Sequence, residues 1–362
     1  MAIPGSGLAS QLTSPVAETT FGVVPAALAS TTKFSAFKSE TLGLKKVVVQ
    51  GEGLFAGKLY AQAARRVVTG WGVDGAIPMD LPARGLQQWL YPMFGSYGQT
   101  PAALTEDAST GAYKAIHAPG SLQGNSFCIQ KGVRTTDGTT EPVTYVGCKI
   151  TEWELSCAKQ QIAELQITID ARNELAGSMN SDPLNGSLPG LVSYVQPPAG
   201  GVFHFLEATV YTGGTPSTTG GVTTLASPVV AGNITQFSVK HTVPLDTERY
   251  FAAGQGFKSE QIENALRQIS GQFTTEWLSA QTMYDAFAAD TATALEYTFL
   301  GPAIGSGSDF STLSILVPNI HLDAAPVETP GPGVITQVVP WTGLDDGTNN
   351  QIQATYWTLD SA

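Results

Sequence analysis

The chain has 362 residues, with 18 Lys or Arg against 30 Asp or Glu, and its formal net charge is −12. Residues 1–180 hold 14 basic and 14 acidic side chains, whereas residues 181–362 hold 4 and 16, which excludes strong sequence-wide affinity for nucleic acid through phosphate neutralisation. The length exceeds what a single hydrophobic core supports, so we expect two domains, and 39 glycines with only 13% charged residues favour a turn-rich, β-rich protein.

Residues 1–32 are rich in Ala, Thr and Pro and lack a hydrophobic period, which predicts an N-terminal arm rather than a core element. This segment has neither the basic nor the apolar region of a signal peptide, and no apolar run reaches the ~18 residues of a transmembrane helix. The three cysteines, Cys128, Cys148 and Cys157, form no CxxC pair, and their odd number argues against a disulfide framework. We therefore expect a soluble protein made in a cytosol.

Alternation of apolar and polar residues predicts amphipathic strands in the first half, at 71–79, 149–157 and 162–170. Thr151, Trp153, Leu155 and Cys157 share one face of the second of these strands. Such alternation is typical of an antiparallel sheet with one buried and one wet face. Residues 82–94 predict a helix that opens with a proline, which the first turn of a helix tolerates.

The second half follows the same plan after a linker over residues 176–200. A strand is expected at 234–243 and another at 268–277, followed by a helix at 280–290. Further strands are expected within 202–214, 292–301, 312–323, 334–341 and 352–360. The Gly- and Thr-rich residues 212–228 predict a flexible loop.

The two halves resemble each other. An ungapped shift of 202 residues aligns Phe55 with Phe257 and Trp71 with Phe273, and an even shift keeps each side chain on its own sheet face. Chance matching of apolar strand positions is the competing explanation. We predict a mainly β fold of two tandem β-sandwich domains, 33–175 and 201–362, each with a flanking helix and together arising by duplication.

No motif predicts a catalytic residue, a metal or a cofactor. Gly51-x-Gly53-x-x-Ala56, with Asp74 about twenty residues on, imitates a dinucleotide fingerprint, but no βαβ pattern follows, so a hairpin or loop tip is the better interpretation. The four histidines are widely spaced, and no GxSxG is present. Residues 345–350 imitate part of a calcium loop, yet Tyr356 stands where such a loop needs Glu, which favours a turn.

Several strings resemble one known family. "YVGCKITEWELS" and "LQITIDARNE" in the first half, and "LDTERYFAAGQGFKSEQIENALRQISGQF" in the second, are similar to tail tube proteins (major tail proteins) of long-tailed, non-contractile bacteriophages, especially those of actinobacterial hosts. The resemblance extends over most of residues 33–362.

The resemblance implies a virion protein made in the bacterial cytoplasm, without enzymatic activity. It implies rings that stack into a tube around a tape-measure protein, with DNA passing through during ejection. Tail terminator and distal tail proteins are the further partners it implies, without membrane insertion. Because most such proteins carry one sandwich in a sixfold ring, a chain with two sandwiches predicts a trimeric, pseudo-sixfold ring.

Two sets of residues are the candidate assembly sites. Polar strand faces are candidates for the tube lumen, although Glu152 and Glu154 also suit paired catalytic carboxylates or an outer wet face. The candidate lumen residues are Glu152, Glu154, Glu164, Asp170, Gln272, Thr274 and Glu276. The long segments 38–64 and 240–265 are candidates for contacts between rings. Their candidate residues are Lys45, Lys46, Phe55, Lys58, Glu248, Phe251, Phe257, Glu260 and Glu263.

Three alternatives stay open. One is a sixfold ring of single sandwiches whose C-terminal half decorates the tube. Another is a surface-binding β-sandwich adhesin, and the last is a dinucleotide enzyme.

Overall fold

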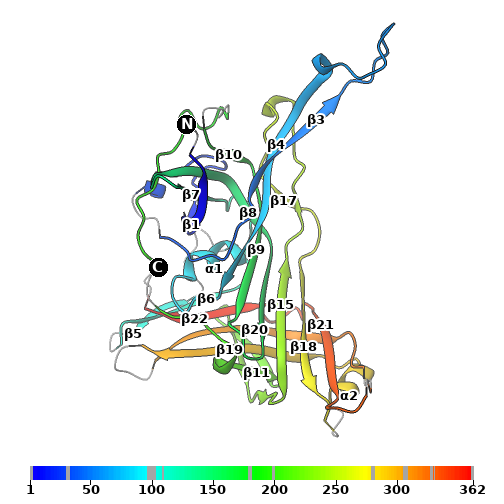
Figure 1. The fold of residues 1–362 in the computed structure, drawn as a ribbon. Helices are drawn as coiled ribbons and strands as arrows, with labels where there is room; N and C mark the ends of the chain where they lie inside the picture. The colour runs from blue at the N-terminus through cyan, green and yellow to red at the C-terminus, as the bar shows by residue number, and fades with distance from the viewer. Residues whose placement is uncertain are drawn as a thin grey trace.

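The computed structural model describes residues 3–29, 33–95, 103–107, 110–177, 182–197, 200–278, 282–304, 309–326, 329 and 331–359. Antiparallel strands dominate, and one long hairpin projects well beyond the body (Figure 1). The predicted mainly β class is confirmed. The strands form two stacked layers and a smaller third sheet.

The first layer is one antiparallel sheet that runs through both halves of the chain. Six consecutive ladders link each strand to its neighbour across this layer. In spatial order the strands are β3 (Gly43–Gln50), β4 (Arg66–Asp80), β9 (Glu164–Ala171), β8 (Thr140–Ala158), β15 (Ile234–Thr242), β18 (Gln268–Glu276) and β21 (Thr336–Gly343).

The second layer packs against the apolar face of the first. The rings of Phe237 and Tyr297 stack at 4.6 Å between centroids, and Trp341 Nε1 donates to the hydroxyl of Tyr297 at 3.3 Å. Apolar side chains from both layers and both halves form one core cluster. In spatial order the strands are β14 (Val229–Val230), β11 (Ala208–Thr212), β19 (Thr293–Ala303), β20 (Phe310–Leu322), β22 (Gln353–Thr358), β6 (Ala112–His117) and β5 (Ala103–Asp107).

The third sheet corrects one prediction. It contains β1 (Gly5–Leu12), β2 (Val16–Ala17), β7 (Phe127–Thr135), the first half of β8 and β10 (Asn173–Leu175). Residues 1–32 were expected to stand outside the core, but β1 and β2 pair with β7, and Leu12 is fully buried. The edge of β7 exposes backbone groups that need partners, and the N-terminal segment supplies them.

The remaining elements are short. Helix α1 (Gln87–Phe94) packs on β8, where the Phe94 ring lies 5.6 Å from that of Trp153, and α2 (Thr282–Ala288) follows β18. Two small ladders pair β12 (Thr215–Thr219) with β13 (Val222–Ala226), and β16 (Leu245–Asp246) with β17 (Ile262–Glu263). Single 3-10 turns occur at Ala26–Ala29, Ala63–Arg65, Phe205–Glu207 and Ala252–Gly254.

Both halves use the same strand order. The first half pairs its strands as β1–β7–β8–β9–β4–β3. The second pairs them as β11–β19–β20–β21–β18–β15. The later strands β10 and β22 also occupy equivalent places, against β8 and β20, and α1 and α2 follow the equivalent strands β4 and β18. This shared order supports the hypothesis of a duplication.

The strand ladders show that equivalent residues of the two halves are not separated by the 202 residues of the ungapped alignment. Val73 lies opposite Ala171 at one end of the β4–β9 ladder, and Ile269 lies opposite Gly343 at the same end of the β18–β21 ladder. Ile269 therefore corresponds to Val73, an offset of 269 − 73 = 196. The earlier offset matched Ile269, which is 6% exposed, with Val67, which is 56% exposed. The first half extends β4 into the projecting hairpin, and this extension misled the ungapped comparison.

The division into domains at 33–175 and 201–362 stays a prediction. The β8–β15 and β22–β6 ladders join strands across that boundary. Residues 182–197 of the expected linker lie against the first half, where Gln130 Nε2 donates to the carbonyl of Gly190 at 3.0 Å and Val192 is buried.

Candidate assembly surfaces

A polar face covers the side of the first layer that points away from the second layer. In β8 the side chains of Trp153 and Leu155 enter the core, whereas Glu154 points to the other side. Glu154 lies opposite Gln166 on β9 and Lys240 on β15. This period-two alternation was predictable, because successive side chains of a strand point to opposite faces.

The polar face is continuous across the two halves because β8 pairs with β15. From β8 the row of Ser156 continues through Ser238 and Gln272, and on the other side it reaches Glu164 and Asp80. Ladder register places all seven candidate lumen residues on this face, and six of them are not covered by another part of the chain: Glu152, Glu154, Glu164, Gln272, Thr274 and Glu276.

Asp170 is the exception among these candidates. Its side chain is buried, with Lys258 Nζ 2.6 Å from Oδ1 and Gln261 Nε2 donating to Oδ2 at 2.7 Å. Burial raises the pKa of this carboxyl despite Lys258. Asp170 therefore serves an internal contact, because residues 258–261 cover the end of β9.

Lysines on the polar face are already neutralised by acids of the same chain. Lys240 Nζ lies 2.7 Å from Glu152, Lys45 Nζ lies 2.5 Å from Asp74, and Lys38 contacts Asp80 and Glu164. Glu154 and Glu276 add further negative charge to the face. A nucleic acid that passed over the described part of this surface would therefore meet hydroxyl, amide and carboxylate groups, together with lysines that are already paired with acids.

The second candidate surface is the arm, which we define as the part of the β3–β4 hairpin that projects beyond the body, with its tip at residues 51–65 (Figure 1). Three apolar side chains at the tip are almost fully exposed: Leu54 at 99%, Leu59 at 95% and Tyr60 at 89%. The glycines imitating a nucleotide motif lie in this loop, as the hairpin interpretation predicted. Exposed apolar side chains grouped this way mark a contact surface.

The candidate ring-stacking residues divide into two groups. Phe55 and Lys58 lie in the tip, and the guanidinium of Arg65 covers the Phe55 ring at 4.3 Å. Lys45 and Lys46 lie on β3, with Lys46 Nζ 5.8 Å from the Trp71 ring.

The other candidates belong to residues 248–263, a segment that we call the strap. Glu248 and Phe251 are exposed there. Phe257 was expected as an exposed tip but is only 4% exposed, because its ring packs under the guanidinium of Arg172. Glu260 and Glu263 bond to Lys149 and Arg267 of the same chain.

Comparison with known proteins decides what these surfaces belong to. A family model described as phage tail tube protein matches residues 14–343. The chain belongs to the phage tail tube protein family. No curated protein matches the chain. The kind of phage, non-contractile and of an actinobacterial host, stays a prediction.

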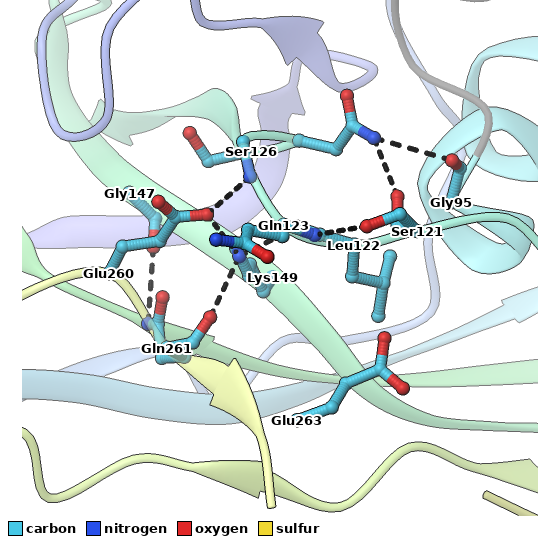
Figure 2. A network of polar contacts seen from close by, with 12 residues as sticks. Gly95, Ser121, Leu122, Gln123, Ser126, Gly147, Lys149, Glu260, Gln261 and Glu263 are labelled. Carbon is cyan, nitrogen blue, oxygen red and sulfur yellow. Dashed lines mark hydrogen bonds and ion pairs between the residues drawn. The ribbon is translucent and has the colours of Figure 1, made fainter.

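In this tail tube protein the strap is fastened to the body by a buried lysine. Lys149 on β8 is fully buried, and its Nζ contacts Glu260 Oε1 at 2.7 Å and the carbonyls of Leu122 at 2.7 Å and Gln261 at 2.8 Å (Figure 2). Burial lowers the pKa of Lys149, whereas three acceptors bind its ammonium form. The network holds two strap residues, the loop that contains Leu122, and β8 together.

The strap also sets the base of the arm of this tail tube protein. Trp71 N donates to the carbonyl of Gly256 at 2.8 Å, and the hydroxyl of Tyr250 donates to the carbonyl of Trp71 at 3.1 Å. Arg172 binds Asp182 at 3.3 Å and the carbonyl of Lys258. The strap thus fixes the direction in which the arm leaves the body.

Sequence reasoning missed the buried lysines and the exposed tip residues Leu54, Leu59 and Tyr60. Lys149 carried a signal, since a charge between Cys148 and Ile150 interrupts an apolar stretch. At the tip, the sequence indicated a loop but not that these three apolar side chains would be exposed. Among the described residues, no helix is long and apolar enough to cross a membrane, and no group of three His, Cys, Asp or Glu is placed to hold a metal. Residues 345–350 form the expected turn, with Asp346 accepting from Asn349 N at 2.8 Å.

Proposed function

We propose that three copies of this chain form a pseudo-sixfold ring, and that stacked rings form a tail tube through which the tape-measure protein and then DNA pass. The observation that carries this proposal is the β8–β15 ladder, which joins the sheets of both halves side by side with a common polar face. A chain built this way supplies two adjacent sixths of a barrel wall.

The size of the ring follows from the repeat. The first half contributes β3, β4, β9 and β8 to the wall, and the second contributes β15, β18, β21 and residues 323–326, which continue from β20 beside β21. Three chains therefore supply about 24 strands, and barrels of 16–18 strands already enclose an aqueous channel. Closing the wall between subunits also removes exposed sheet edges, which otherwise lead to aggregation.

The polar face suits the inner surface of such a tube. DNA that must slide gains no counterion-release affinity from a wall whose lysines are paired with acids. Carboxylates such as Glu154 and Glu276, which pair with no lysine or arginine in the described part of the chain, repel phosphates. The wall needs no catalytic group or cofactor, so we propose a structural and non-enzymatic role. Tail terminator and distal tail proteins would contact the two ends of the tube.

The arm suits contacts between rings. Its apolar tip stands beyond the sheet that would form the ring, and burial of Leu54, Leu59 and Tyr60 would contribute more than exposed ion pairs, which stabilise by ~0–1 kcal/mol each. Lys46, Lys58 and Glu248 are then accessory contacts, whereas Lys45 lies at the body end of β3 beside Asp74.

Electron microscopy of the concentrated protein tests the ring. We expect tubes whose rings have sixfold-like projections, and a covalently cross-linked ring of three chains. Rings of six chains, or only monomers under several salt conditions, would refute the proposal.

Cysteine labelling tests which face lines the lumen. Gln272→Cys in assembled tubes should react with a small maleimide but not with a maleimide linked to a polymer wider than the bore. Leu300→Cys on β19, which is 50% exposed in the second layer, is the control and should react with both. Equal polymer labelling of the two positions would place the polar face outside.

A further inference from the structure

Two edges of the first layer have no strand beside them in the described chain. β3 pairs with β4 on one side only. At the other end, residues 323–326 continue from β20 along β21, where Asp323 N donates to the carbonyl of Pro340 at 2.9 Å, and no described strand borders their other side. An open edge of this kind presents unpaired backbone groups.

The internal repeat identifies what belongs beside residues 323–326. The equivalent part of the first half is residues 152–155 of β8, which have β9 on one side and β15 on the other. β15 occupies in the second half the place that β3 occupies in the first. The missing neighbour is therefore a copy of β3, and the chain's own β3 lies at the opposite end of the layer.

We infer that β3 of one subunit pairs antiparallel with residues 323–326 of a second copy of this chain, and that this contact closes the ring laterally. The inference rests on the proposed ring function and adds the interface and its register.

The register of β3 follows from the first layer. Lys45 lies opposite Gly72, and Thr242 lies opposite Gln268. Gly72 and Gln268 are equivalent, because 268 − 72 = 196 is the offset between β4 and β18. Lys45 is thus the counterpart of Thr242.

The register of residues 323–326 follows in the same way. Glu152 lies opposite Thr168, and Asp323 lies beside Pro340. Thr168 and Pro340 are equivalent, because 340 − 168 equals 343 − 171, the offset of 172 between β9 and β21. Asp323 is thus the counterpart of Glu152.

Within the chain, Thr242 and Glu152 lie opposite each other, so Lys45 of one subunit is placed opposite Asp323 of its neighbour. The next pair along the ladder is Leu44 with Ala324. The Thr242 hydroxyl donates to Glu152 at 3.3 Å, which is the internal version of the proposed contact.

The chemistry of the two edges agrees with this register. Lys45 and Asp323 are exposed and of opposite charge, and Lys45, which contacts Asp74 of its own chain at 2.5 Å, would then lie between two carboxylates. Leu44 is 37% exposed, whereas its counterpart His241 is 1% exposed, with its ring 5.7 Å from that of Trp153. Pairing would cover Leu44 as β8 covers His241.

Disulfide trapping tests the register. Directly opposed residues of an antiparallel pair have Cα atoms ~4.5–5.5 Å apart, within disulfide range, and the native cysteines are buried. The double variant Leu44→Cys with Ala324→Cys should give, after oxidation of assembled rings, closed covalent trimers on a non-reducing denaturing gel. The control, Val49→Cys with Ala324→Cys, shifts the pair by five residues, roughly 17 Å, and should give none.

The same samples distinguish the proposed register from the proposed tube function. Rings seen by microscopy without cross-linked chains in the matched variant, or with equal cross-linking in the control, would overturn the register while leaving the tube function intact. Absence of rings from the unmodified chain would overturn both.

Charge exchange provides an independent measurement. Lys45→Glu and Asp323→Lys should each slow ring formation. The double variant should form rings faster than either single variant but more slowly than the parent, because its carboxylate at position 45 also lies beside Asp74. Thermal melting of the monomers checks that all variants fold. A double variant slower than either single one would contradict the pairing.

Discussion

Removal of the Lys149 ammonium group should loosen the strap and lower the stability of the fold. In Lys149→Met the carbonyl oxygens of Leu122 and Gln261 lose a donor at 2.7 and 2.8 Å, and Glu260 loses its ion pair. Each buried acceptor left without a donor costs about 1–3 kcal/mol, and breaking a buried ion pair typically costs about 3–5 kcal/mol. Because the Glu260 side chain is 26% exposed, the loss of its ion pair costs less than that of a fully buried pair, and we expect the three losses together to lower the free energy of unfolding by about 3–5 kcal/mol.

The matched control is Lys240→Met. Lys240 has the same 2.7 Å distance to a carboxylate, Glu152, but the two side chains are 38% and 29% exposed. Exposed pairs contribute about 0–1 kcal/mol, so this variant should unfold almost as the parent does. Tryptophan fluorescence during urea unfolding of the monomer measures both losses.

Hydrogen exchange locates the effect. In Lys149→Met, strap amides that donate hydrogen bonds should exchange faster, such as those of Phe257, which donates to Gly254, and Ser259, which donates to Arg249. The amides of β18 should change less. Equal losses of unfolding free energy in the Lys149 and Lys240 variants would refute the argument, because they would show that burial does not set the strength of these contacts.

Three further predictions concern the core, the arm and pH. Gly271→Ala should lower the free energy of unfolding in urea by about 3 kcal/mol or more, because its Cβ would lie 2.2 Å from the carbonyl oxygen of Ser238 and 2.4 Å from the Trp341 ring. Gly232→Ala is the control, because open space surrounds that position. An unchanged stability of Gly271→Ala would contradict the packing. Leu59→Ser with Tyr60→Ser should leave monomer melting unchanged but stop ring stacking in micrographs, and tubes of normal length would rule out the arm as the contact. Burial raises the pKa of Glu18 to about 7 from an ordinary 4.5. Its contribution to stability is therefore fully present below pH 4.5 and is lost as the pH rises to about 7. Glu18→Gln should reduce the difference between the urea midpoints measured at pH 5 and pH 8, and an unchanged difference would show that another group causes it.

The sequence by itself determined the class of fold and the faces of its strands. Alternation over residues 151–157 and 268–276 assigned buried and wet sides correctly, because a strand's side chains alternate whatever its partner is. It also indicated a repeat and both helices, although α1 begins at Gln87 rather than near Pro82. These are local properties of the chain.

Only the tertiary structure decided which strands meet. Strand pairing joins residues far apart in the chain, and many registers satisfy the same alternation, so nothing local specified that β15 pairs with β8. For the same reason, the alternation placed Asp170 on a wet face, although the strap covers it. Phe257 was likewise expected at an exposed tip, although the guanidinium of Arg172 covers its ring. Burial depends on what packs over a residue, and the alternation within its own strand does not show which distant segment that is.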